Sequence, residues 1–483
     1  MRTISREQVV KRLKAENPWW DARRTASLPA REWKPRAYFD LFMPLVTRTE
    51  IRRAVVLMGP RRVGKTVMIH HSIQRLIADG IPPRSICYFS VDHPIYNGLG
   101  LEELLEFFRD ATGTDYATEP SFVFFDEVQY LRDWEIHLKS LVDTYSPLKL
   151  VASGSAAAAL RLKSGESGAG RFTDFLLPPL TFYEYLDLLG EADRVKVEAG
   201  EMRTDDIQGL NARFMDYLNF GGYPEVVFSK EIQADPGRFI KNDIIDKVLL
   251  RDLPGLYGIR DIQELNYLFT TLAFNTANEI SLDELAKRSG VAKNTIKRYI
   301  EYLEAAFLIR VVHRVDRSAK RFHRANFFKV YLTNPSMRAA LFSPISADDE
   351  MIGALAETAI FAQWFHSNQA LHYARWQGGE VDIVLLGQKQ KPELAVEVKW
   401  SDQYARKPGD LRSLLAFCEA NGLTDATVTS RTKSAHTNVR GVDLTFIPAS
   451  IYCYLIGARN IAVRWLDAEL SARVTIDNAT SED

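Results

Sequence analysis

Short apolar runs alternate with amphipathic segments between residues 54 and 152. Four runs have the length and composition of strands, at 54–58, 86–91, 122–125 and 148–152. Three segments between them have helical spacing, at 65–78, 101–111 and 133–144. Because strands that alternate with helices are joined by right-handed crossovers, this pattern predicts an α/β fold with a mainly parallel, doubly wound sheet.

The pattern changes in the rest of the chain. The first fifty residues show no clean period and are interpreted as an irregular lead-in, and Gly, Ser and Ala dominate 153–170, which predicts a loop. Helical periodicity prevails from about 182 to 310, and strand-like runs return at 327–332, 381–386 and 394–399. We therefore predict four parts, at 1–180, 181–270, 271–330 and 331–483.

Composition excludes several classes of protein. A chain of 483 residues that is 46% hydrophobic and 25% charged is too apolar for disorder and too long for one small binding module. Its 61 basic and 62 acidic residues nearly cancel, so attraction to nucleic acid must come from local patches. Three widely spaced cysteines favour a reducing cytoplasm over a disulfide framework or a zinc ribbon. The sequence shows no secretion signal and no apolar stretch long enough to span a membrane, so we expect no membrane partner.

The run GPRRVGKT, at 59–66, is a candidate phosphate-binding loop. It fits G-x-x-x-x-G-K-[ST], follows an apolar run and opens an amphipathic segment. Glycines let the backbone N–H groups surround phosphate oxygens, while Lys65 reaches the β/γ-phosphates and the Thr66 hydroxyl holds Mg²⁺. We expect ATP and Mg²⁺ as cofactors. The other expected nucleotide contacts are Gly59, Arg62, Val63, Gly64 and Val67.

Two carboxylates follow the third apolar run, in SFVFFDEVQYL. Since a parallel strand delivers its carboxyl end to the ligand edge of the sheet, Asp126 is expected in the Mg²⁺ shell and Glu127 as the group that polarises the attacking water. The next run ends near Ser153 and Ser155, whose hydroxyls are candidates for the γ-phosphate or its water. An ordinary Ser/Gly loop is the alternative for these two serines.

Residues 280–315 carry the pattern of a helix-turn-helix with a turn at Gly290, in which the run at 308–315 would form the first strand of a wing. Between Lys287 and Lys329 we count twelve basic residues against three acids, an excess typical of a phosphate-binding surface. DNA is the expected partner, although winged helices also serve as protein-contact modules. The candidate DNA contacts are Lys293, Lys297, Arg298, Arg314, Arg317, Lys320 and Arg321.

A second group of acids with a lysine lies late in the chain. Alternation along 394–399 puts Glu397 and Lys399 on one face of a strand, and Asp382 falls on a neighbouring strand. Two carboxylates can bind Mg²⁺ while a lysine orients water, which is the chemistry of a metal-dependent phosphodiesterase. The string resembles the D…E-x-K core of restriction-endonuclease-like nucleases, with Glu357 as a further acid on a preceding helix and Glu380 as a possible addition. A salt-bridged sheet edge or an inactive relic of that fold is the alternative.

Together, several strings resemble the prokaryotic AAA+-type ATPases that carry a C-terminal restriction-endonuclease-like domain of unassigned function. They are GPRRVGKT, FFDEVQYL, ASGS, GRF before LLPPLTFYEYL, and FGGYPEVV. The resemblance implies a ring-shaped homo-oligomer, with a hexamer favoured. It also implies that Arg171 is an arginine finger supplied to the neighbouring subunit, whereas spacing alone leaves it equally a surface arginine. No second sensor arginine can be assigned in the helical region.

The parts thus predict an AAA+-type P-loop ATPase domain, a helical lid, a winged helix and a restriction-endonuclease-like α/β domain. Our leading hypothesis is a Mg-ATP-hydrolysing motor, of the helicase kind, that remodels or translocates duplex or branched DNA such as a Holliday junction. Two alternatives stay open. One is an ATP-gated, metal-dependent nuclease of defence or repair, and the other is a regulatory switch without motor activity.

Overall fold

The computed structural model describes residues 5–21, 28–155, 170–198, 201–321, 326–364, 369–387 and 389–461. The chain forms two compact units, the first ending at Pro178 and the second beginning at Pro179. This division lies beside the boundary that we predict near 180, whereas those near 270 and 330 fall inside the second unit. No helix among these ranges is long and apolar enough to cross a membrane.

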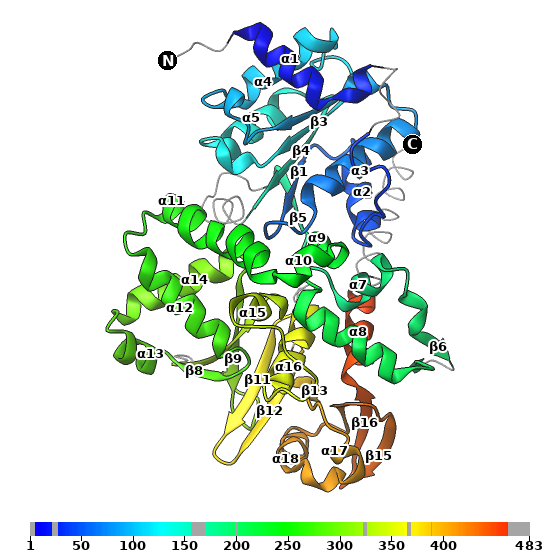
Figure 1. Ribbon diagram of the computed structural model, residues 1–483, viewed down its shortest axis with the longest axis vertical. Coiled ribbons are helices and arrows are strands. Elements are labelled where there is room, and N and C mark those ends of the chain that lie inside the picture. The colour runs from blue at the N-terminus through cyan, green and yellow to red at the C-terminus, as the bar shows by residue number, and fades with distance from the viewer. Residues whose placement is uncertain are drawn as a thin grey trace. The chain divides into compact units, whose positions relative to one another are not determined.

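The first unit is built on a five-stranded parallel sheet in the order β2-β3-β4-β1-β5 (Figure 1). Its strands are β1 (Ala54–Met58), β2 (Ile86–Ser90), β3 (Ser121–Asp126), β4 (Leu148–Gly154) and β5 (Phe172–Leu176). Every residue of β1, β3 and β4 is buried, which explains why these strands have continuous apolar runs. Because β1 and β3 both pair with β4, the chain segments that follow these three strands meet at one edge of the sheet.

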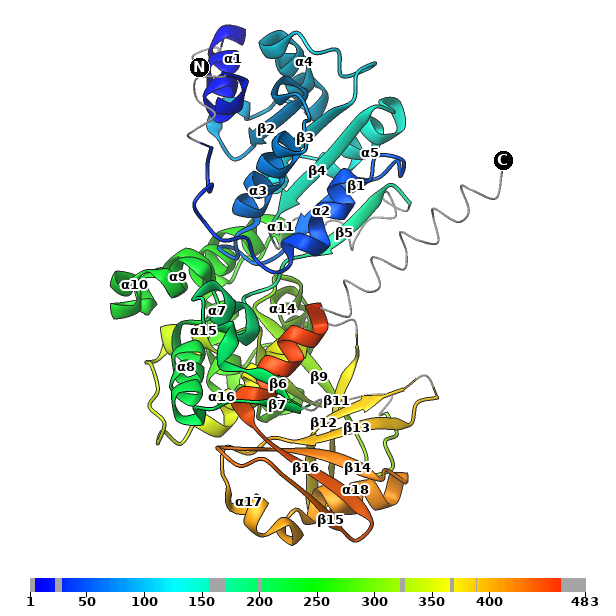
Figure 2. The ribbon, with the colours of Figure 1, turned by 90° about the vertical axis from the view of Figure 1, so that its right-hand side faces the viewer.

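Helices accompany this sheet (Figures 1 and 2). They are α1 (Arg6–Glu16), α2 (Phe39–Thr47), α3 (Lys65–Ala78), α4 (Leu101–Thr112) and α5 (Trp134–Thr144), with short 3-10 turns η1 (Pro18–Trp20), η3 (Pro83–Ser85), η4 (Pro94–Tyr96) and η5 (Val128–Tyr130). The three helices that we predict between the strands are confirmed, with ends that differ by at most one residue. The parallel, doubly wound sheet is confirmed as well.

The N-terminal lead-in covers the edge strand β2. The Asn17 side chain donates to the Tyr88 carbonyl at 2.8 Å and accepts from the Tyr88 N–H at 2.7 Å, as a neighbouring strand would. The indoles of Trp19 and Trp20 both donate to the Ile86 carbonyl. These contacts occupy backbone groups that an edge strand otherwise leaves unpaired.

The second unit begins with helices and a small hairpin. Its elements up to the wing are α7 (Phe182–Leu188), η7 (Ala192–Arg194), β6 (Lys196–Glu198), β7 (Glu201–Arg203), α8 (Ile207–Phe220), α9 (Pro224–Phe228), α10 (Lys230–Ala234), the π-helical η8 (Gly237–Asp246) and η9 (Val248–Asp252), α11 (Leu253–Tyr257) and α12 (Ile262–Phe274). The helical region that we predict is therefore present, interrupted by the β6–β7 hairpin.

A helix-turn-helix follows, and its wing continues into the last part of the chain. These elements are β8 (Glu279–Ser281), α13 (Leu282–Ser289), α14 (Lys293–Ala305), β9 (Ile309–Val315), β10 (Phe327–Leu332), α15 (Ser336–Leu341), α16 (Ile352–Trp364), β11 (Leu371–Trp376), β12 (Gly379–Leu386), β13 (Pro392–Glu397), α17 (Gln403–Arg406), η10 (Pro408–Asp410), α18 (Arg412–Asn421), β14 (Asp425–Ser430), β15 (Ala435–Val439) and β16 (Val442–Pro448). Residues 449–461 are helical.

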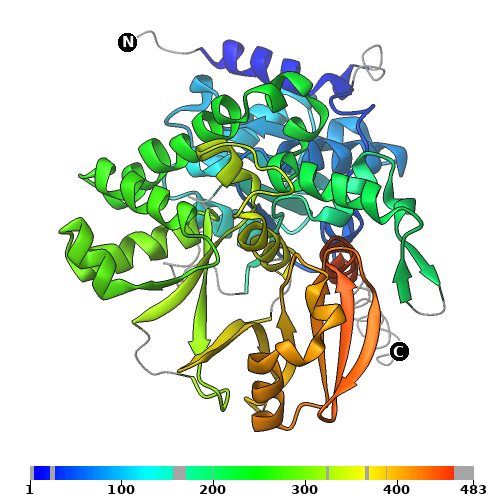
Figure 3. The ribbon, with the colours of Figure 1, turned by 60° about the horizontal axis from the view of Figure 1, so that its bottom comes forward.

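One mixed sheet of nine strands joins the wing to the C-terminal part, in the order β15-β16-β14-β13-β12-β11-β9-β10-β8. The junction is a parallel pairing of β9 with β11, in which His313 lies opposite His372. Figure 3 shows these strands in green through orange. The boundary that we predict at 330 lies within β10, so it does not separate two sheets. The reason is tertiary: β9 pairs with β10 along one edge, and its other edge pairs with β11, so the later strands extend the same sheet.

Candidate functional site

The phosphate loop connects β1 to α3, and backbone geometry explains its glycines. A Cβ on Gly59 would lie 2.0 Å from the Leu177 carbonyl oxygen, so no side chain fits there. Gly64 caps α3 with a φ of 96°, in the left-handed region that favours glycine. The loop therefore curls tightly at the N-terminus of a 14-residue helix, where free N–H groups favour anions.

Lys65 lies buried inside this loop. Its ammonium donates to the carbonyls of Gly59 at 3.0 Å and Pro60 at 2.8 Å, within the ring of backbone that is expected to surround the phosphates. A residue that we did not predict for this site also stabilises the loop by hydrogen bonds. Arg36 donates to the carbonyls of Val63 and Pro178, at 2.9 and 2.8 Å, and its position far upstream of the motif provides no sequence signal.

Asp126 is the last residue of β3, and its carboxylate accepts hydrogen bonds from hydroxyl groups on three elements. Thr66 on α3 donates to Asp126 Oδ2 at 2.7 Å, Ser153 on β4 donates to Oδ1, and Tyr88 on β2 donates to Oδ2 at 3.0 Å. Mg²⁺ prefers oxygen ligands such as carboxylates and hydroxyls, so the Thr66 and Asp126 side chains fit a magnesium ion. The sequence had placed Thr66, Asp126 and Ser153 at this edge but contained no signal for Tyr88.

Glu127 is the next residue and adopts a left-handed backbone, with a φ of 60°. Its N–H donates to the Ser153 hydroxyl at 3.4 Å. Burial raises the pKa of the Glu127 carboxyl, while the neighbouring Lys65 charge acts in the opposite direction. A raised pKa makes this carboxylate a stronger base toward water.

Gln129 is a second residue that sequence reasoning missed. Its Nε2 donates to Glu127 Oε2, and its Oε1 accepts the Ser155 N–H at 3.2 Å. The side chain therefore links the candidate catalytic carboxylate to the chain directly after β4. Ser155 itself is buried, and its hydroxyl has no hydrogen-bond partner among the described residues.

Arg171 lies at the amino-terminal end of the strands of the same sheet, whereas the phosphate loop lies at their carboxyl-terminal end. The Arg171 carbonyl accepts the N–H of Ala54 at the beginning of β1, and the phosphate loop follows the end of that strand. Its exposed guanidinium donates to Asp143 on α5 at 2.8 Å. Within its own chain, Arg171 is therefore remote from Lys65. Most of the Gly/Ser-rich loop that we expect before it, at 156–169, lies outside the described residues.

Some of the candidate DNA contacts are exposed, and others form contacts within the protein. Five of the seven are exposed, namely Lys297, Arg298, Arg317, Lys320 and Arg321. Lys293 is half-buried and forms an ion pair with Asp283 at 2.5 Å. Arg314 is tied to the sheet through the Arg375 carbonyl at 3.0 Å and through Glu279. One of the twelve basic residues that we counted, Lys329, is buried and cannot face DNA.

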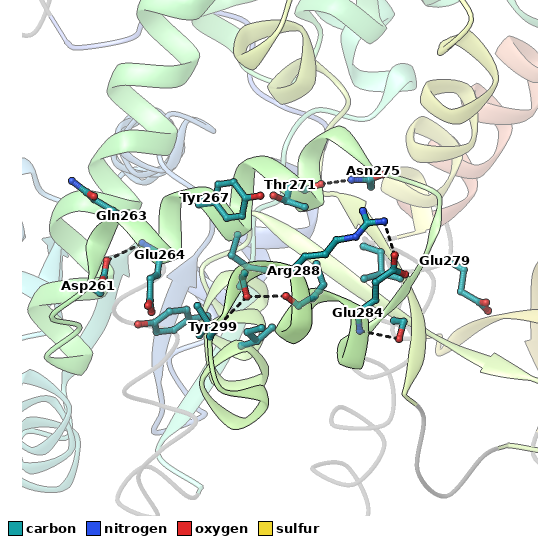
Figure 4. Close-up of a pocket in the computed structure, with 17 residues that line it drawn as sticks. Asp261, Gln263, Glu264, Tyr267, Thr271, Asn275, Glu279, Glu284, Arg288 and Tyr299 are labelled. Atoms are coloured by element: carbon teal, nitrogen blue, oxygen red, sulfur yellow. Dashed lines mark hydrogen bonds and ion pairs between the residues drawn. The ribbon is translucent and has the colours of Figure 1, made fainter.

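A cavity of about 420 Å³ lies beside this helix-turn-helix, lined by residues of α12, β8, α13 and α14 (Figure 4). Four carboxylates line it, from Asp261, Glu264, Glu279 and Glu284. The cation in the lining, Arg288, is paired with Glu284 at 2.7 Å, as the dashed line in Figure 4 shows. An acidic lining repels phosphate, so this cavity does not suit a nucleotide or a DNA backbone.

The four residues of the predicted nuclease-like site do come together in the second unit. Lys399 Nζ lies 2.7 Å from Glu397 and 3.8 Å from Asp382. Asp382 Oδ2 accepts the Val398 N–H at 2.8 Å. Glu357, on α16, joins them through a residue that we did not predict for this site. That residue is Lys329 on β10, whose ammonium lies 3.0 Å from Glu357 and 3.7 Å from Asp382.

We call this group the carboxylate–lysine cluster and define it by Lys329, Glu357, Glu380, Asp382, Glu397 and Lys399. Burial raises the pKa of the Glu357 carboxyl to about 7 and that of Glu397 to about 8. Burial opposes the charge of Lys329, yet the surrounding carboxylates hold its pKa above its usual value. The same balance raises the pKa of Lys399. The ionic groups of the cluster thus depend on one another.

The cluster does not fit a divalent metal. Lys329 occupies the space among Glu357, Glu380 and Asp382, and Lys399 the space between Asp382 and Glu397. The geometry therefore differs from our expectation that Asp382 and Glu397 bind Mg²⁺, and agrees better with the salt-bridged alternative.

Two family models match parts of the chain. Residues 51–186 match an AAA domain. The first unit is therefore similar to AAA domains, which supports the predicted P-loop fold, nucleotide binding and ATPase activity in general. Residues 211–349 match a domain of unknown function (DUF8612). That match crosses both predicted boundaries at 270 and 330 and identifies no restriction-endonuclease-like domain.

Relatives and solved structures add little to this assignment. An uncharacterized protein of Methanocaldococcus jannaschii is 24% identical over 345 residues, which cover 70% of this chain and 73% of that protein. An uncharacterized protein of Haemophilus influenzae is 22% identical and covers 68% of this chain and 78% of its own length. The Aeropyrum pernix Orc1 protein, solved in complex with DNA, is 15% identical with a TM-score of 0.31, over 65% of this chain and 94% of that one. Such a TM-score assigns no function.

Proposed function

We propose that this protein is a Mg-ATP-hydrolysing, AAA+-type motor that acts on DNA in the cytoplasm. The observation that carries the proposal is the meeting of Thr66, Asp126 and Ser153 at one sheet edge, beside a phosphate loop that encloses Lys65. Three free and buried cysteines, Cys87, Cys418 and Cys453, support the location in a reducing compartment.

Each residue of this edge has a distinct role in hydrolysis. The loop N–H groups and Lys65 bind the phosphates, and Thr66 and Asp126 would hold Mg²⁺, which supplies positive charge to the transferring phosphoryl group. Glu127 orients and deprotonates the attacking water. Ser153 keeps the Asp126 carboxylate and the Glu127 backbone in place through its hydroxyl. Gln129 positions the Glu127 side chain.

The winged helix provides the proposed DNA contact. Lys297 and Arg298 are exposed on α14, while Lys320 and Arg321 are exposed on the wing. The inner face of α14 packs through Ile296, which is buried, so the basic face of the helix points away from the core. Neutralising phosphates with such side chains releases counterions and strengthens binding at low salt.

A ring of identical subunits, with a hexamer favoured, would complete the ATPase site. Arg171 lies at the sheet edge opposite its own phosphate loop, so it would act on a neighbouring subunit. We expect Arg171→Ala to lower ATPase turnover about 1000-fold with ATP affinity nearly intact, because a finger acts on transition-state charge. In mixtures of Lys65→Ala and Arg171→Ala protein, some activity should return. No return despite demonstrated subunit exchange contradicts a role in trans.

One experiment tests the proposal as a whole. ATPase rate is measured without DNA and with matched linear, forked and four-way DNAs, and the lengths of the DNA strands are read from the same samples. A motor predicts stimulation by DNA with strands left intact. Cleavage would favour the ATP-gated nuclease instead, and ATP hydrolysis that no DNA alters would favour a regulatory switch.

A further inference from the structure

Lys329 is the least exposed side chain among the ion pairs of the carboxylate–lysine cluster, at 3%. It projects from β10, a strand of the wing, into a group of acids carried by α16 and β12. A buried ammonium is costly unless its charge is compensated. Three carboxylates compensate it here, from Glu380 at 2.7 Å, Glu357 at 3.0 Å and Asp382 at 3.7 Å.

The surrounding contacts leave few ligand positions for a second cation. Glu357 Oε1 also accepts the Tyr331 hydroxyl at 2.6 Å, and Arg375 pairs with Glu380 at 3.1 Å. On the other side of Asp382, Lys399 bonds to Glu397. One carboxylate oxygen of the cluster, Glu397 Oε2, is buried without a hydrogen-bond partner among the described residues, and a single oxygen does not make a metal site.

We propose that Lys329 is a built-in cation that takes the place of a divalent metal and closes this cluster to metal-dependent cleavage. A metal ion among Glu357, Glu380 and Asp382 would have to share their charge with an ammonium that already lies among them, and the two cations would repel each other. The wing therefore contributes a structural cation to the C-terminal part. That part would bind DNA or stabilise the wing and would not cleave DNA.

The proposal predicts that a metal site appears when the ammonium is removed. Lys329→Met keeps the length of the side chain and deletes its charge. We expect the full-length Lys329→Met protein, without nucleotide, to gain one Mn²⁺ site at least tenfold tighter than any that wild-type protein has in the cluster. Electron paramagnetic resonance of free Mn²⁺ measures the gain. Adding Asp382→Asn should abolish it, and Lys391→Met, which changes an exposed lysine in the turn between β12 and β13, should gain nothing.

Two results would overturn the proposal. One is a folded Lys329→Met protein, by circular dichroism, that gains no Mn²⁺ site. The other needs no Lys329 variant: wild-type protein that nicks supercoiled plasmid with Mn²⁺, in an activity that Asp382→Asn removes, shows that the cluster is already a metal site. Intact plasmid under the same conditions supports closure. ATPase activity, measured in the same preparations, reports on the proposed function separately.

Discussion

The two units each combine an aspartate with lysines, and the cations occupy different positions relative to the acid. In the first unit, Lys65 bonds to loop carbonyls, and Asp126 faces the neutral hydroxyls of Thr66, Ser153 and Tyr88. In the second unit, Asp382 lies between two ammonium groups, those of Lys329 and Lys399. The residue types are alike, and their arrangement differs.

This difference shows that an aspartate near a lysine can either remain available to a metal cation or be paired with the lysine. Hydroxyls hold a carboxylate in place without bringing a positive charge beside it, so the contacts of Asp126 do not oppose a cation. Two ammonium groups lie beside Asp382 and offset part of its charge, so an incoming metal would meet their repulsion. An acid and a lysine near each other in a sequence therefore do not by themselves indicate a metal site.

Within the comparison of the two sites, the largest effect is expected from Lys65, the lysine of the phosphate-loop site. Lys65→Ala should lower ATP hydrolysis by about 1000-fold, since it deletes the charge that stabilises the transferring phosphoryl group. Steady-state phosphate release measures this, with Lys391→Ala, at an exposed lysine of the other unit, as the matched control. Hydrolysis at the wild-type rate in Lys65→Ala would refute the nucleotide site.

The same aspartate-to-asparagine change should affect the two sites in different ways. Asp382→Asn should lower the free energy of unfolding of the second unit by about 3 kcal/mol, because it leaves the buried Lys329 ammonium and the partly buried Lys399 ammonium undercompensated. Asp126→Asn should lower Mg²⁺-dependent ATP hydrolysis and change the unfolding free energy much less. Urea unfolding and ATPase assays on both variants test this contrast, and equal destabilisation would remove it.

Glu127→Gln should separate ATP binding from ATP hydrolysis at the phosphate-loop site. We expect ATP affinity near that of wild type and turnover lower by about 100-fold, since the water loses its base while Lys65 and Asp126 remain. Fluorescent-nucleotide titration and single-turnover hydrolysis provide the two measurements. If hydrolysis persists at the wild-type rate, the catalytic carboxylate lies elsewhere.

The smallest effect is expected from the exposed lysines and arginines, in contrast to the enclosed Lys329. Reversing the charge of the exposed Lys297 and Arg298 together should weaken DNA binding by about tenfold at moderate salt and flatten its dependence on salt concentration. Fluorescence anisotropy over a series of salt concentrations measures both. Unchanged affinity and slope would mean that this surface binds something other than DNA.

Local patterns were sufficient for much of the first unit. A continuous apolar run predicts a buried parallel strand wherever it lies, so β1 to β4 and the helices between them follow from the sequence. The fifth strand, β5, escaped prediction because its five residues, FTDFL, include the half-buried Thr173 and the exposed Asp174. Tyr88 and Gln129 escaped because their contacts with Asp126 and Glu127 depend on side-chain direction, which spacing does not reveal.

By itself, the sequence determined the phosphate loop, the acids after β3 and the helix-turn-helix, because each depends on residues close together in the chain. Tertiary structure decided the rest. The pairing of β9 with β11 joined the wing to the C-terminal sheet, and it carried Lys329 into contact with Glu357 and Asp382, 28 residues and more away. Electrostatic energy depends on distance in space, so the sequence revealed which charges are present and only the fold decided which of them cancel.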